Sequence, residues 1–574
     1  MASFPDPPPP VPATTTEELD RKLERLAAKK DAWCAVSVEK RIGYLDSILG
    51  GLGEVAAAWV EGGAKLKGLA PTDPLVGEEW LAGPVVTARN VRLLASALRH
   101  GGTPKAALRP GPGGRTIARV FPDGALERVM LGGVTADVWT QPGKPATQGR
   151  IYREKPERGK TCLVLGGGNV SSIPPMDVLY KLFVEGETCL LKMNPVNEHV
   201  GPRLERAFAR LVDDGFLEVA YGGADVGGYA AEHEAVDTLH VTGSDRTYDA
   251  IVWGPEGDRA ARKASGERRN ARPFSAELGC VTPVIVVPGP WSAADIKFQA
   301  RHVAGMVTQN ASFNCNAAKV LVMARGWLQR EAFLDALHGE LARSPARKAY
   351  YPGAHSRYDA FLGAYPRAVK LGREGEGVVP WTVIPDVAGE PGEHALTHEA
   401  FCGVLAELTL DVADTHGGVR RDAPYVDAAR FLREAVRLAN ERCWGTLSCT
   451  VLVHPSTREE LGLELDRAVE ELRYGGVGVN CWPGLIYGLV SPTWGAFPGH
   501  TAEDIQSGVG VVHNTHMFDH PEKTVVTAPF RQFPAPPYVG GVANLVELGQ
   551  RMFELERTGR WGALGSVAMA ALKG

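Results

Sequence analysis

Strand-like apolar runs alternate with helix-like segments along most of this chain, and this alternation constrains the fold more than any other feature. In the first series, the expected strands and helices are in turn 162–165, 175–185, 188–191, 201–214, 238–241 and 246–253. Strands that alternate with helices in this way are typical of a parallel sheet with helices packed on it. The sequence therefore predicts an α/β domain in this part of the chain.

A second alternation begins at residue 284. Its expected strands and helices are in turn 284–287, 295–308, 319–323, 326–343, 404–410, 427–440 and 450–454. A chain of 574 residues is too long for one hydrophobic core, so length alone predicts two or three domains. The predicted fold class is α/β, with two Rossmann-like parallel-sheet domains.

Other stretches indicate where these domains end. Residues 5–13 are rich in proline and predict a disordered or extended lead. Thr15 and Glu18 have the spacing of a capping box, which would open an amphipathic helix that runs to about residue 30. The polar, proline-containing segment 136–158 is interpreted as a projecting hairpin, and 523–529 as a short edge strand.

Composition argues against several classes of function. Net charge is −5, from 62 basic and 67 acidic residues with no long basic block, so no nucleic-acid partner is expected. No apolar run approaches the roughly 20 residues that span a bilayer, and no signal pattern opens the chain, so no membrane partner is expected. The nine cysteines form no CxxC pair, which favours reduced thiols in a cytoplasmic protein. His513, His516 and His520 show no clear helical pattern, and no metal site is predicted.

Cys315 and Glu277 are the two residues that most directly indicate chemistry. Cys315 lies in a polar stretch just before an expected strand, and Glu277 is followed by Leu-Gly and another apolar strand. A thiolate can attack an aldehyde carbonyl, and a carboxylate can activate the water that later releases the acid from a thioester. Each residue alone also has an ordinary interpretation, as an inert thiol or as a carboxylate in a salt bridge.

Six segments, in the same order along the chain, resemble the aldehyde dehydrogenase superfamily. They are 163–169, 189–195, 241–244, 277–279, 314–315 and 398–403. The resemblance extends over about residues 20–530. It implies NAD or NADP as the cofactor, a small-molecule aldehyde as the substrate and a carboxylic acid as the product. Because a fold does not by itself define a function, the activity is an expectation at this point.

The resemblance also implies an arrangement of domains, with a small β oligomerisation arm and hence a homodimer or homotetramer. The strand at 523–529 would pair with the hairpin in this arm. The expected ranges are 1–14 for the disordered lead, 15–135 and 159–284 for the NAD(P)-binding domain, 136–158 and 511–530 for the arm, 285–510 for the catalytic domain, and 531–574 for a C-terminal extension. The extension lies beyond the usual end of the family, so the resemblance says nothing of it; we expect a helix near 541–557 there and expect it to pack against a neighbouring subunit.

In such a protein Cys315 would be the nucleophile and Glu277 the general base that hydrolyses the thioester. Asn169 would donate its side-chain amide to the oxyanion, together with the backbone N–H of the nucleophile. Neutral donors placed where negative charge develops lower the barrier, by roughly 3–4 kcal/mol for one donor. Glu399 would bind the nicotinamide ribose, and Phe401 would pack near the nicotinamide.

The remaining cofactor residues would bind the adenosine and pyrophosphate. Lys192 follows an expected strand and would bind the adenine ribose. Many NAD-preferring relatives carry Glu three residues later, where this chain has Pro195, so NADP is expected to be tolerated. Gly243 and Ser244 precede a helix, whose N-terminus can bind the pyrophosphate. Relatives usually carry a second glycine five residues after the first, where this chain has Tyr248.

Two other functions stay open. An acylating enzyme of the same fold would pass the acyl group to coenzyme A, but such relatives typically lack the base at the position of Glu277. A catalytically silent scaffold of the same fold would be consistent with the departures at Pro195, Tyr248 and 496–499.

Overall fold

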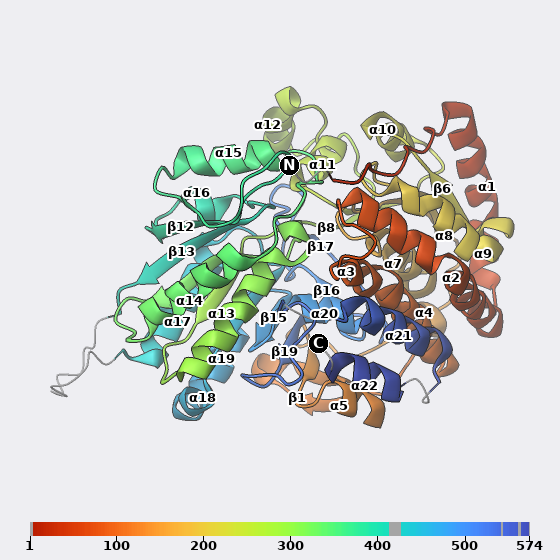
Figure 1. Ribbon diagram of the computed structural model, residues 1–574. Coiled ribbons are helices and arrows are strands. Elements are labelled where there is room, and N and C mark those ends of the chain that lie inside the picture. Colours follow the sequence, from red (N-terminus) through yellow and green to blue (C-terminus); the bar gives the residue numbers. More distant parts are fainter. Residues whose placement is uncertain (1–3, 413–425, 541–542, 561–563, 573–574) are drawn as a thin grey trace.

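The computed structural model describes residues 4–412, 426–540, 543–560 and 564–572, which form two large sheets with helices packed on them (Figure 1). The smaller sheet has six strands in the order β17-β8-β7-β4-β5-β6. The larger has eleven strands in the order β1-β2-β3-β19-β15-β14-β9-β10-β13-β12-β11. The predicted α/β class, with parallel strands in both sheets, is confirmed. In the described part of the chain, no helix is long and apolar enough to cross a membrane.

Five parallel strands make up most of the six-stranded sheet. They are β4 (Thr161–Leu165), β5 (Thr188–Lys192), β6 (Leu217–Ala220), β7 (Thr238–Thr242) and β8 (Phe274–Glu277), and β17 (Gly508–Val509) is antiparallel to β8. All residues of the first four are buried, as expected of a parallel sheet covered on both faces. The connecting helices are α7 (Ile173–Tyr180), η3 (Lys181–Glu185), η4 (Glu198–Val200), α8 (Gly201–Ala207), α9 (Ala209–Asp213), α10 (Ala224–Glu232), α11 (Asp245–Val252) and α12 (Glu256–Ser265).

The N-terminal helices share a hydrophobic core with the six-stranded sheet. They are α1 (Thr16–Ala35), α2 (Val38–Leu66), α3 (Val76–Trp80), η1 (Leu81–Val85) and α4 (Val86–Arg99). The predicted capping box is confirmed, because Thr15 and Glu18 satisfy each other's backbone N–H groups. The helix that it opens extends to Ala35, beyond the predicted end at about residue 30.

Six parallel strands form the centre of the eleven-stranded sheet. They are β9 (Thr282–Val286), β10 (Ala318–Ala324), β12 (Thr382–Val387), β13 (Val404–Leu410), β14 (Ser448–Leu452) and β15 (Gly476–Val479), with β11 (Val369–Lys370) antiparallel at one edge. The helices of this part are α13 (Ala293–Thr308), η5 (Gln309–Ser312), α14 (Arg330–Arg343), α15 (Ala354–Ala364), α16 (His394–Thr397), α17 (Ala428–Arg442), α18 (Pro455–Leu461), α19 (Leu463–Glu471) and α20 (Gly484–Leu489). A short sheet of β16 (Trp494–Gly495) and β18 (Val511–Val512) follows.

The remaining strands correct the predicted hairpin at 136–158. The observed hairpin joins β2 (Thr116–Phe121) to β3 (Thr135–Thr140), with β1 (Ala107–Pro110), η2 (Pro112–Gly114) and α5 (Ala125–Met130) nearby. After Thr140 the chain leaves the sheet and forms α6 (Arg150–Arg153). Prolines at 142 and 145 explain the difference, because a proline has no N–H to donate within a sheet.

The strand predicted at 523–529 is β19 (Pro521–Thr527), and it pairs with this hairpin through β3, as predicted. Its other edge pairs in parallel with β15 of the same chain, so both edges of β19 are occupied within one subunit. The domain ranges and the oligomeric state given above stay predictions.

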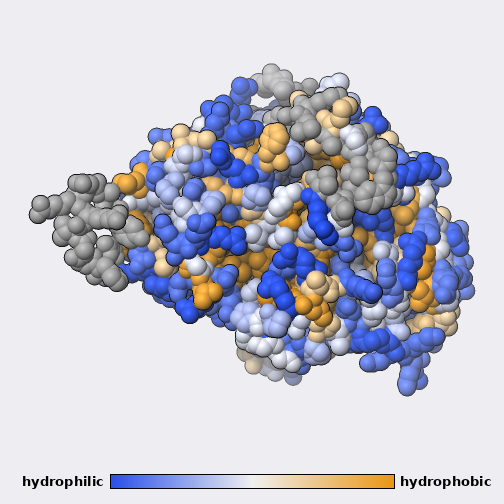
Figure 2. Space-filling model, turned by 90° about the horizontal axis from the view of Figure 1, so that it is seen from below, coloured by the Kyte–Doolittle hydropathy of each residue, from blue (hydrophilic) through white to orange (hydrophobic). Residues whose placement is uncertain are grey.

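The C-terminal extension packs on the helices of its own chain. It contains α21 (Leu545–Thr558), close to the predicted helix at 541–557, and α22 (Leu564–Leu572). Figure 1 shows α21 beside α4, and Glu556 forms ion pairs with Arg89 at 2.8 Å and Arg92 at 2.6 Å. The extension thus packs within its own chain, and the expected packing on a neighbouring subunit stays a prediction. Seen from below, hydrophilic and hydrophobic residues are mixed over the surface, with the hydrophobic ones mainly toward its centre (Figure 2).

Candidate active site

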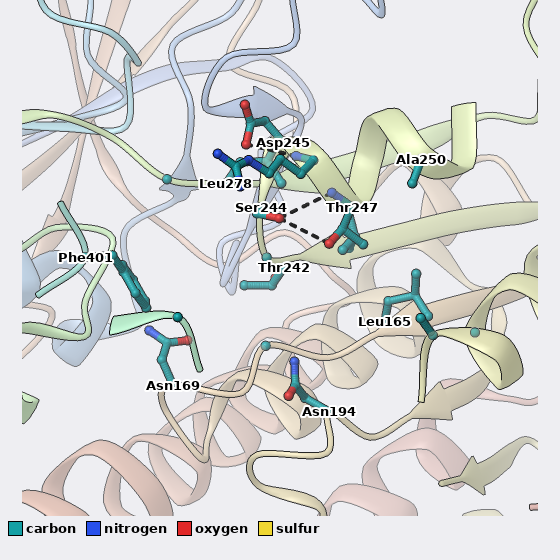
Figure 3. Close-up of a pocket in the computed structure, with 18 of the residues that line it drawn as sticks. Leu165, Asn169, Asn194, Thr242, Ser244, Asp245, Thr247, Ala250, Leu278 and Phe401 are labelled. Carbon is teal, nitrogen blue, oxygen red and sulfur yellow. Dashed lines mark hydrogen bonds between the residues drawn. The ribbon is translucent and has the colours of Figure 1, made fainter. Parts of the chain in front are cut away.

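One cavity of about 1320 Å³ lies between the two large sheets, and every predicted site residue lines it. These residues are Asn169, Lys192, Gly243, Ser244, Glu277, Cys315, Glu399 and Phe401. Figure 3 shows Asn169 and Phe401 on one side of the cavity and Leu165 and Ala250 on the other. The carboxyl ends of the parallel strands β4, β5 and β7 lead into loops along its wall, which is where open α/β sheets bind their ligands.

Cys315 and Glu277 come together although one precedes a strand of the eleven-stranded sheet and the other ends a strand of the six-stranded sheet. Glu277 is the last residue of β8, and Cys315 lies in the loop between η5 and β10. The Cys315 Sγ lies 3.5 Å from Glu277 Oε1, within hydrogen-bond distance for a thiol. The indole Nε1 of Trp494 donates to the same Glu277 oxygen at 3.1 Å. A nucleophile, a base and a residue that orients the base are thus in contact.

Burial controls the proton affinity of both groups. It raises the pKa of Glu277 to about 8, and the negative charge of Asp177 adds to the rise, while the hydrogen bonds from Trp494 and Cys315 oppose it. Burial also raises the pKa of the Cys315 thiol well above its usual value, with further contributions from the charges of Glu277 and Glu399. At neutral pH both groups are therefore mainly protonated, and Glu277 must be ionised before it can accept the proton of the thiol.

Lys319 is a cation that acts on Cys315, and it could not be identified from the sequence. Its Nζ donates to the carbonyl oxygens of Asn314, Cys315 and Ala317 at 3.1–3.2 Å and lies 3.2 Å from Glu399 Oε1. Its positive charge lowers the pKa of Cys315 against the effect of burial. The sequence feature that could have identified Lys319 is its position at the start of an apolar strand, because a charge buried there requires partners.

The loop before Cys315 has an unusual backbone conformation. Asn310, Ala311 and Ser312 have φ angles of 53°, 55° and 67°, in the left-handed region that costs energy for residues with a side chain. The Asn310 side chain donates to the carbonyl oxygens of Asn169 and Phe313 at 3.1 and 3.2 Å, which holds the loop in place. Such strain, held by buried polar contacts, is common where a reactive group must be aimed.

Asn169 follows β4 and is held in place by contacts with the loop that precedes Cys315. Its Nδ2 donates to the Phe313 carbonyl at 2.9 Å, and its own carbonyl accepts from the Tyr350 hydroxyl at 2.9 Å. An amide nitrogen has two N–H groups, so a second donor remains beside the cavity that Asn169 lines. The residue predicted to bind the oxyanion is thus held next to the residues that precede Cys315.

The predicted phosphate-binding turn is the N-terminus of α11. Ser244 caps this helix by accepting from the backbone N–H of Thr247, as drawn in Figure 3. Tyr248, which stands where relatives usually carry glycine, is buried and packs against Phe274 with ring centroids 4.8 Å apart. Its side chain is not part of the cavity wall, so it leaves the start of the helix accessible.

At the other end of the cavity, Glu399 occupies a position that depends on a glycine. A Cβ at Gly279 would lie 1.9 Å from Glu399 Oε2, so any other residue there would displace the carboxylate. Phe401 packs on Tyr351 with ring centroids 5.1 Å apart, and the guanidinium of Arg357 lies over its ring. Within the described ranges, no group of three or more His, Cys, Asp or Glu side chains could hold a metal ion.

Fold and cavity together define a two-sheet α/β protein with a thiol–carboxyl pair at the base of a nucleotide-sized cleft. Residues 166–349 match the model of the aldehyde dehydrogenase family. No curated protein sequence matches the chain.

Solved structures share the fold at low sequence identity. The NADP-dependent glyceraldehyde-3-phosphate dehydrogenase of Bacillus halodurans C-125, complexed with NADP, has a TM-score of 0.59 and 16% identity, over 90% of this chain and 92% of that one. The aldehyde dehydrogenase KauB of Pseudomonas aeruginosa has a TM-score of 0.58 and 18% identity, over 89% and 88%. An NAD-dependent aldehyde dehydrogenase of Sinorhizobium meliloti has a TM-score of 0.57 and 18% identity, over 92% of both. The chain thus shares its fold with these aldehyde dehydrogenases, and residues 166–349 carry the family's sequence pattern.

Proposed function

We propose that this protein oxidises an aldehyde to a carboxylic acid with NAD or NADP, through a thioester on Cys315 that is hydrolysed with Glu277 as general base. The match of residues 166–349 to the aldehyde dehydrogenase family model supports aldehyde oxidation in general terms. The observation that carries the particular mechanism is the 3.5 Å contact between Cys315 Sγ and Glu277 Oε1 at the base of the cavity.

The cavity suits a nicotinamide dinucleotide. The positive end of the α11 dipole favours a pyrophosphate, Lys192 can donate to the adenosine end, and Glu399 can accept from ribose hydroxyls. The space that Gly279 leaves for Glu399 supports this assignment. When bound, NAD or NADP supplies the hydride acceptor that converts the aldehyde adduct on Cys315 into a thioester. Pro195 in place of an acidic residue removes one source of repulsion for a 2′-phosphate.

In the first half of the reaction Glu277 accepts the thiol proton and the Cys315 sulfur attacks the carbonyl carbon. The S–C bond forms as the carbonyl π pair moves to oxygen. Asn169 and the backbone N–H of Cys315 would stabilise the resulting oxyanion, and Lys319 fixes the peptide group of Cys315. The negative charge that develops at sulfur is favoured by the Lys319 ammonium.

After the thiol proton has left Glu277, the ionised Glu277 takes a proton from water while the water oxygen attacks the thioester carbon. The tetrahedral adduct collapses, the C–S bond breaks, and the Cys315 thiolate takes up the proton held by Glu277, which restores both groups. Only the ionised form of Glu277 can do this, and its pKa of about 8 places that form on the alkaline side of neutrality. The contact of Glu277 with Cys315 favours water over coenzyme A as the acyl acceptor.

Intact-protein mass spectrometry on wild type and Cys315→Ala, with an aldehyde panel and either cofactor, tests this function. Reduced nicotinamide formed by wild type alone, with a transient acyl group on Cys315, is the expected result. An acyl group that persists until coenzyme A is added would assign the acylating reaction instead. No reduction and no adduct with any aldehyde would favour the silent scaffold.

The homodimer or homotetramer and the cytoplasmic location also remain proposals. Because β19 is paired on both edges, a second copy could add to the sheet only at β1 or β11. All four residues of β1 are exposed, which leaves its outer edge accessible. Sedimentation of the purified protein would measure the oligomeric state.

A further inference from the structure

Three consecutive glycines, Gly166, Gly167 and Gly168, follow β4 at the edge of the cavity. A Cβ at Gly168 would lie 2.6 Å from both Cγ and Oδ1 of Asn194, so any side chain at position 168 would collide with this amide. The φ angle of Gly168 is outside the left-handed region, so the need for glycine comes from this contact and not from the backbone. Asn194 therefore occupies the space that a side chain at position 168 would fill.

Asn194 is fixed through its oxygen atoms, which leaves its side-chain nitrogen available. The backbone N–H of Val196 donates to Asn194 Oδ1 at 3.0 Å, and that of Asn197 donates to the Asn194 carbonyl at 3.1 Å. The first of these bonds also assigns which side-chain atom is oxygen and which is nitrogen. In the part of the chain that the structure describes, Asn194 Nδ2 donates to no protein group, so both of its N–H groups are available to a ligand.

Hydrogen bonds join the loop that carries Asn194 to the glycine loop. Asn197 is almost fully buried, and its Nδ2 donates to the Gly167 carbonyl at 2.9 Å. The Gly166 N–H donates to the Lys192 carbonyl at 3.2 Å. The amide of Asn194 is thus presented to the cavity by a framework of two neighbouring loops, one after β4 and one after β5.

Asn194 lines the cavity near its middle. In Figure 3 it lies between Asn169 and Leu165, and Ser244 at the start of α11 lies on the opposite wall. A dinucleotide that extends from the predicted adenosine end to the predicted nicotinamide end passes between these two walls. The group at the centre of such a dinucleotide is its pyrophosphate.

A neutral amide donor suits a phosphate oxygen. Phosphate oxygens of a dinucleotide only accept hydrogen bonds, and a bond from N–H to an anion is roughly twice as strong as one between neutral groups. On the opposite wall, the side chains of Asp245 and Arg246 carry opposite charges, so the dipole of α11 remains as the field that favours an anion. A ribose hydroxyl differs from a phosphate because it can donate as well as accept, so it would also bond to a carboxylate.

We propose that the side-chain amide of Asn194 binds the pyrophosphate of NAD or NADP, opposite the N-terminus of α11. The proposal rests on the function proposed above, in which this cavity holds the dinucleotide. Asn194 Nδ2 donates to a phosphate oxygen, while Oδ1 keeps its bond from the Val196 N–H. The contact is possible because position 168 carries no side chain, so Gly168 acts through Asn194 as a positioning residue.

Asn194→Asp is the most direct test, because the carboxylate can keep the bond from Val196 and exchanges only the free donor for a charged acceptor. The dissociation constant of ADP-ribose, measured by titration calorimetry on the full chain, should rise on the order of 100-fold, since an attraction becomes a repulsion. Asn194→Ala, which only removes the donor, should raise it on the order of tenfold. The fluorescence of bound NADH and NADPH should rank the variants in the same order.

A double-mutant cycle tests the part played by Gly168. Gly168→Ala should displace the amide and weaken binding of ADP-ribose about as much as Asn194→Ala does, on the order of tenfold. In the double variant the added methyl group meets no amide, so the combined loss should be close to that of either single variant and not to their product. Adenosine lacks the pyrophosphate, so its competition with NADH should change little in any of the three.

Asn440→Asp is the matched control for the added charge. Asn440 Oδ1 likewise accepts a backbone N–H, from Arg473, but Asn440 lies on α17 and is not part of the cavity wall. This variant should bind ADP-ribose as wild type does.

Weaker binding in Asn194→Asp than in Asn194→Ala, with adenosine affinity retained, supports the proposal. Binding in Asn194→Asp as tight as in wild type, or tighter, assigns the amide to a ribose hydroxyl and overturns it. Should Asn194→Asp not fold, the cycle with Gly168→Ala decides, and multiplicative losses or no losses in that cycle overturn the proposal. If wild type binds neither ADP-ribose nor NADH, the proposed function itself fails. Aldehyde-dependent reduction by wild type, together with normal binding in every variant, would refute only the role of Asn194.

Discussion

The two sides of the cavity hold their reactive groups in opposite ways. On the eleven-stranded sheet, Cys315 is positioned through its backbone, by Lys319 and by a loop with left-handed φ angles. On the six-stranded sheet, Glu277 is positioned through its side chain, by Trp494, and lies among acidic groups. The nucleophile side is cationic and rigid in its main chain, while the base side is anionic and contains exchangeable protons. The side of the eleven-stranded sheet thus controls the geometry of the nucleophile, and the side of the six-stranded sheet controls the protonation of the base.

The largest expected effect comes from removing the nucleophile. Cys315→Ala should abolish aldehyde-dependent reduction of NAD or NADP, a loss on the order of 10⁴-fold or more, because no other group in the cavity can form the thioester. Cofactor reduction followed by absorbance measures this. Cys34→Ala is the control, since Cys34 is the other partly exposed cysteine. If Cys315→Ala kept an activity near that of wild type, Cys315 would not be the nucleophile, and the two sides of the cavity would not differ in this way.

The base side should respond mainly in hydrolysis. Glu277→Gln should slow release of the acid by roughly 10²–10⁴-fold and let the acyl-enzyme accumulate. In wild type, hydrolysis should increase with pH through about 8, because the active form of Glu277 is the ionised one and its pKa is about 8. Single-turnover hydrolysis at a series of pH values gives the profile. A hydrolysis rate that stays constant between about pH 6 and about pH 9 would argue against Glu277 as the base.

A smaller effect is expected from Lys319 on the nucleophile side. Lys319→Met leaves Glu399 buried without its cation and frees three carbonyl oxygens, which should lower the free energy of unfolding by about 3–5 kcal/mol. The thiol should also react with iodoacetamide only at higher pH. Lys319→Arg keeps the charge and should retain most of the thiol reactivity. Identical alkylation profiles in all three proteins would show that the cation does not act on sulfur.

The smallest effect should come from Trp494. Trp494→Phe removes the indole donor that lowers the pKa of Glu277, so that pKa should rise and the hydrolysis profile should move to higher pH by about one unit. Cys315 alkylation should change little. Trp482→Phe is a useful comparison, because the Trp482 indole donates to Asn316 instead of the base. A shift toward lower pH would contradict the assigned role of the indole.

The local sequence was sufficient to predict the roles of some of these residues but not of others. The strand–helix alternation predicts both sheets, and the segments around Cys315 and Glu277 stand out through their residue types. Lys319 and Trp494 look like ordinary residues of a strand and a turn, and only tertiary packing shows their partners. Gly168 and Asn194 belong to different loops and meet only because β4 and β5 lie side by side.

The misplaced hairpin has a related cause. Polar residues and prolines suggested a turn at 136–158, but the turn lies earlier, where 122–134 connects β2 to β3. Pairing in a sheet depends on which edges are available at a distance in sequence, and composition within a window does not contain that information.

The position of β19 has a consequence for biosynthesis. This strand ends at Thr527, yet it lies between β3, which ends at Thr140, and β15 in the eleven-stranded sheet. Until the ribosome has released residue 527, the β1-β2-β3 hairpin has no partner on that side and the parallel strands have an unfilled edge. The six-stranded sheet can be completed except for β17 much earlier. The larger sheet can therefore close only after residue 527 has been synthesised, and until then it has unpaired strand edges, which favour aggregation.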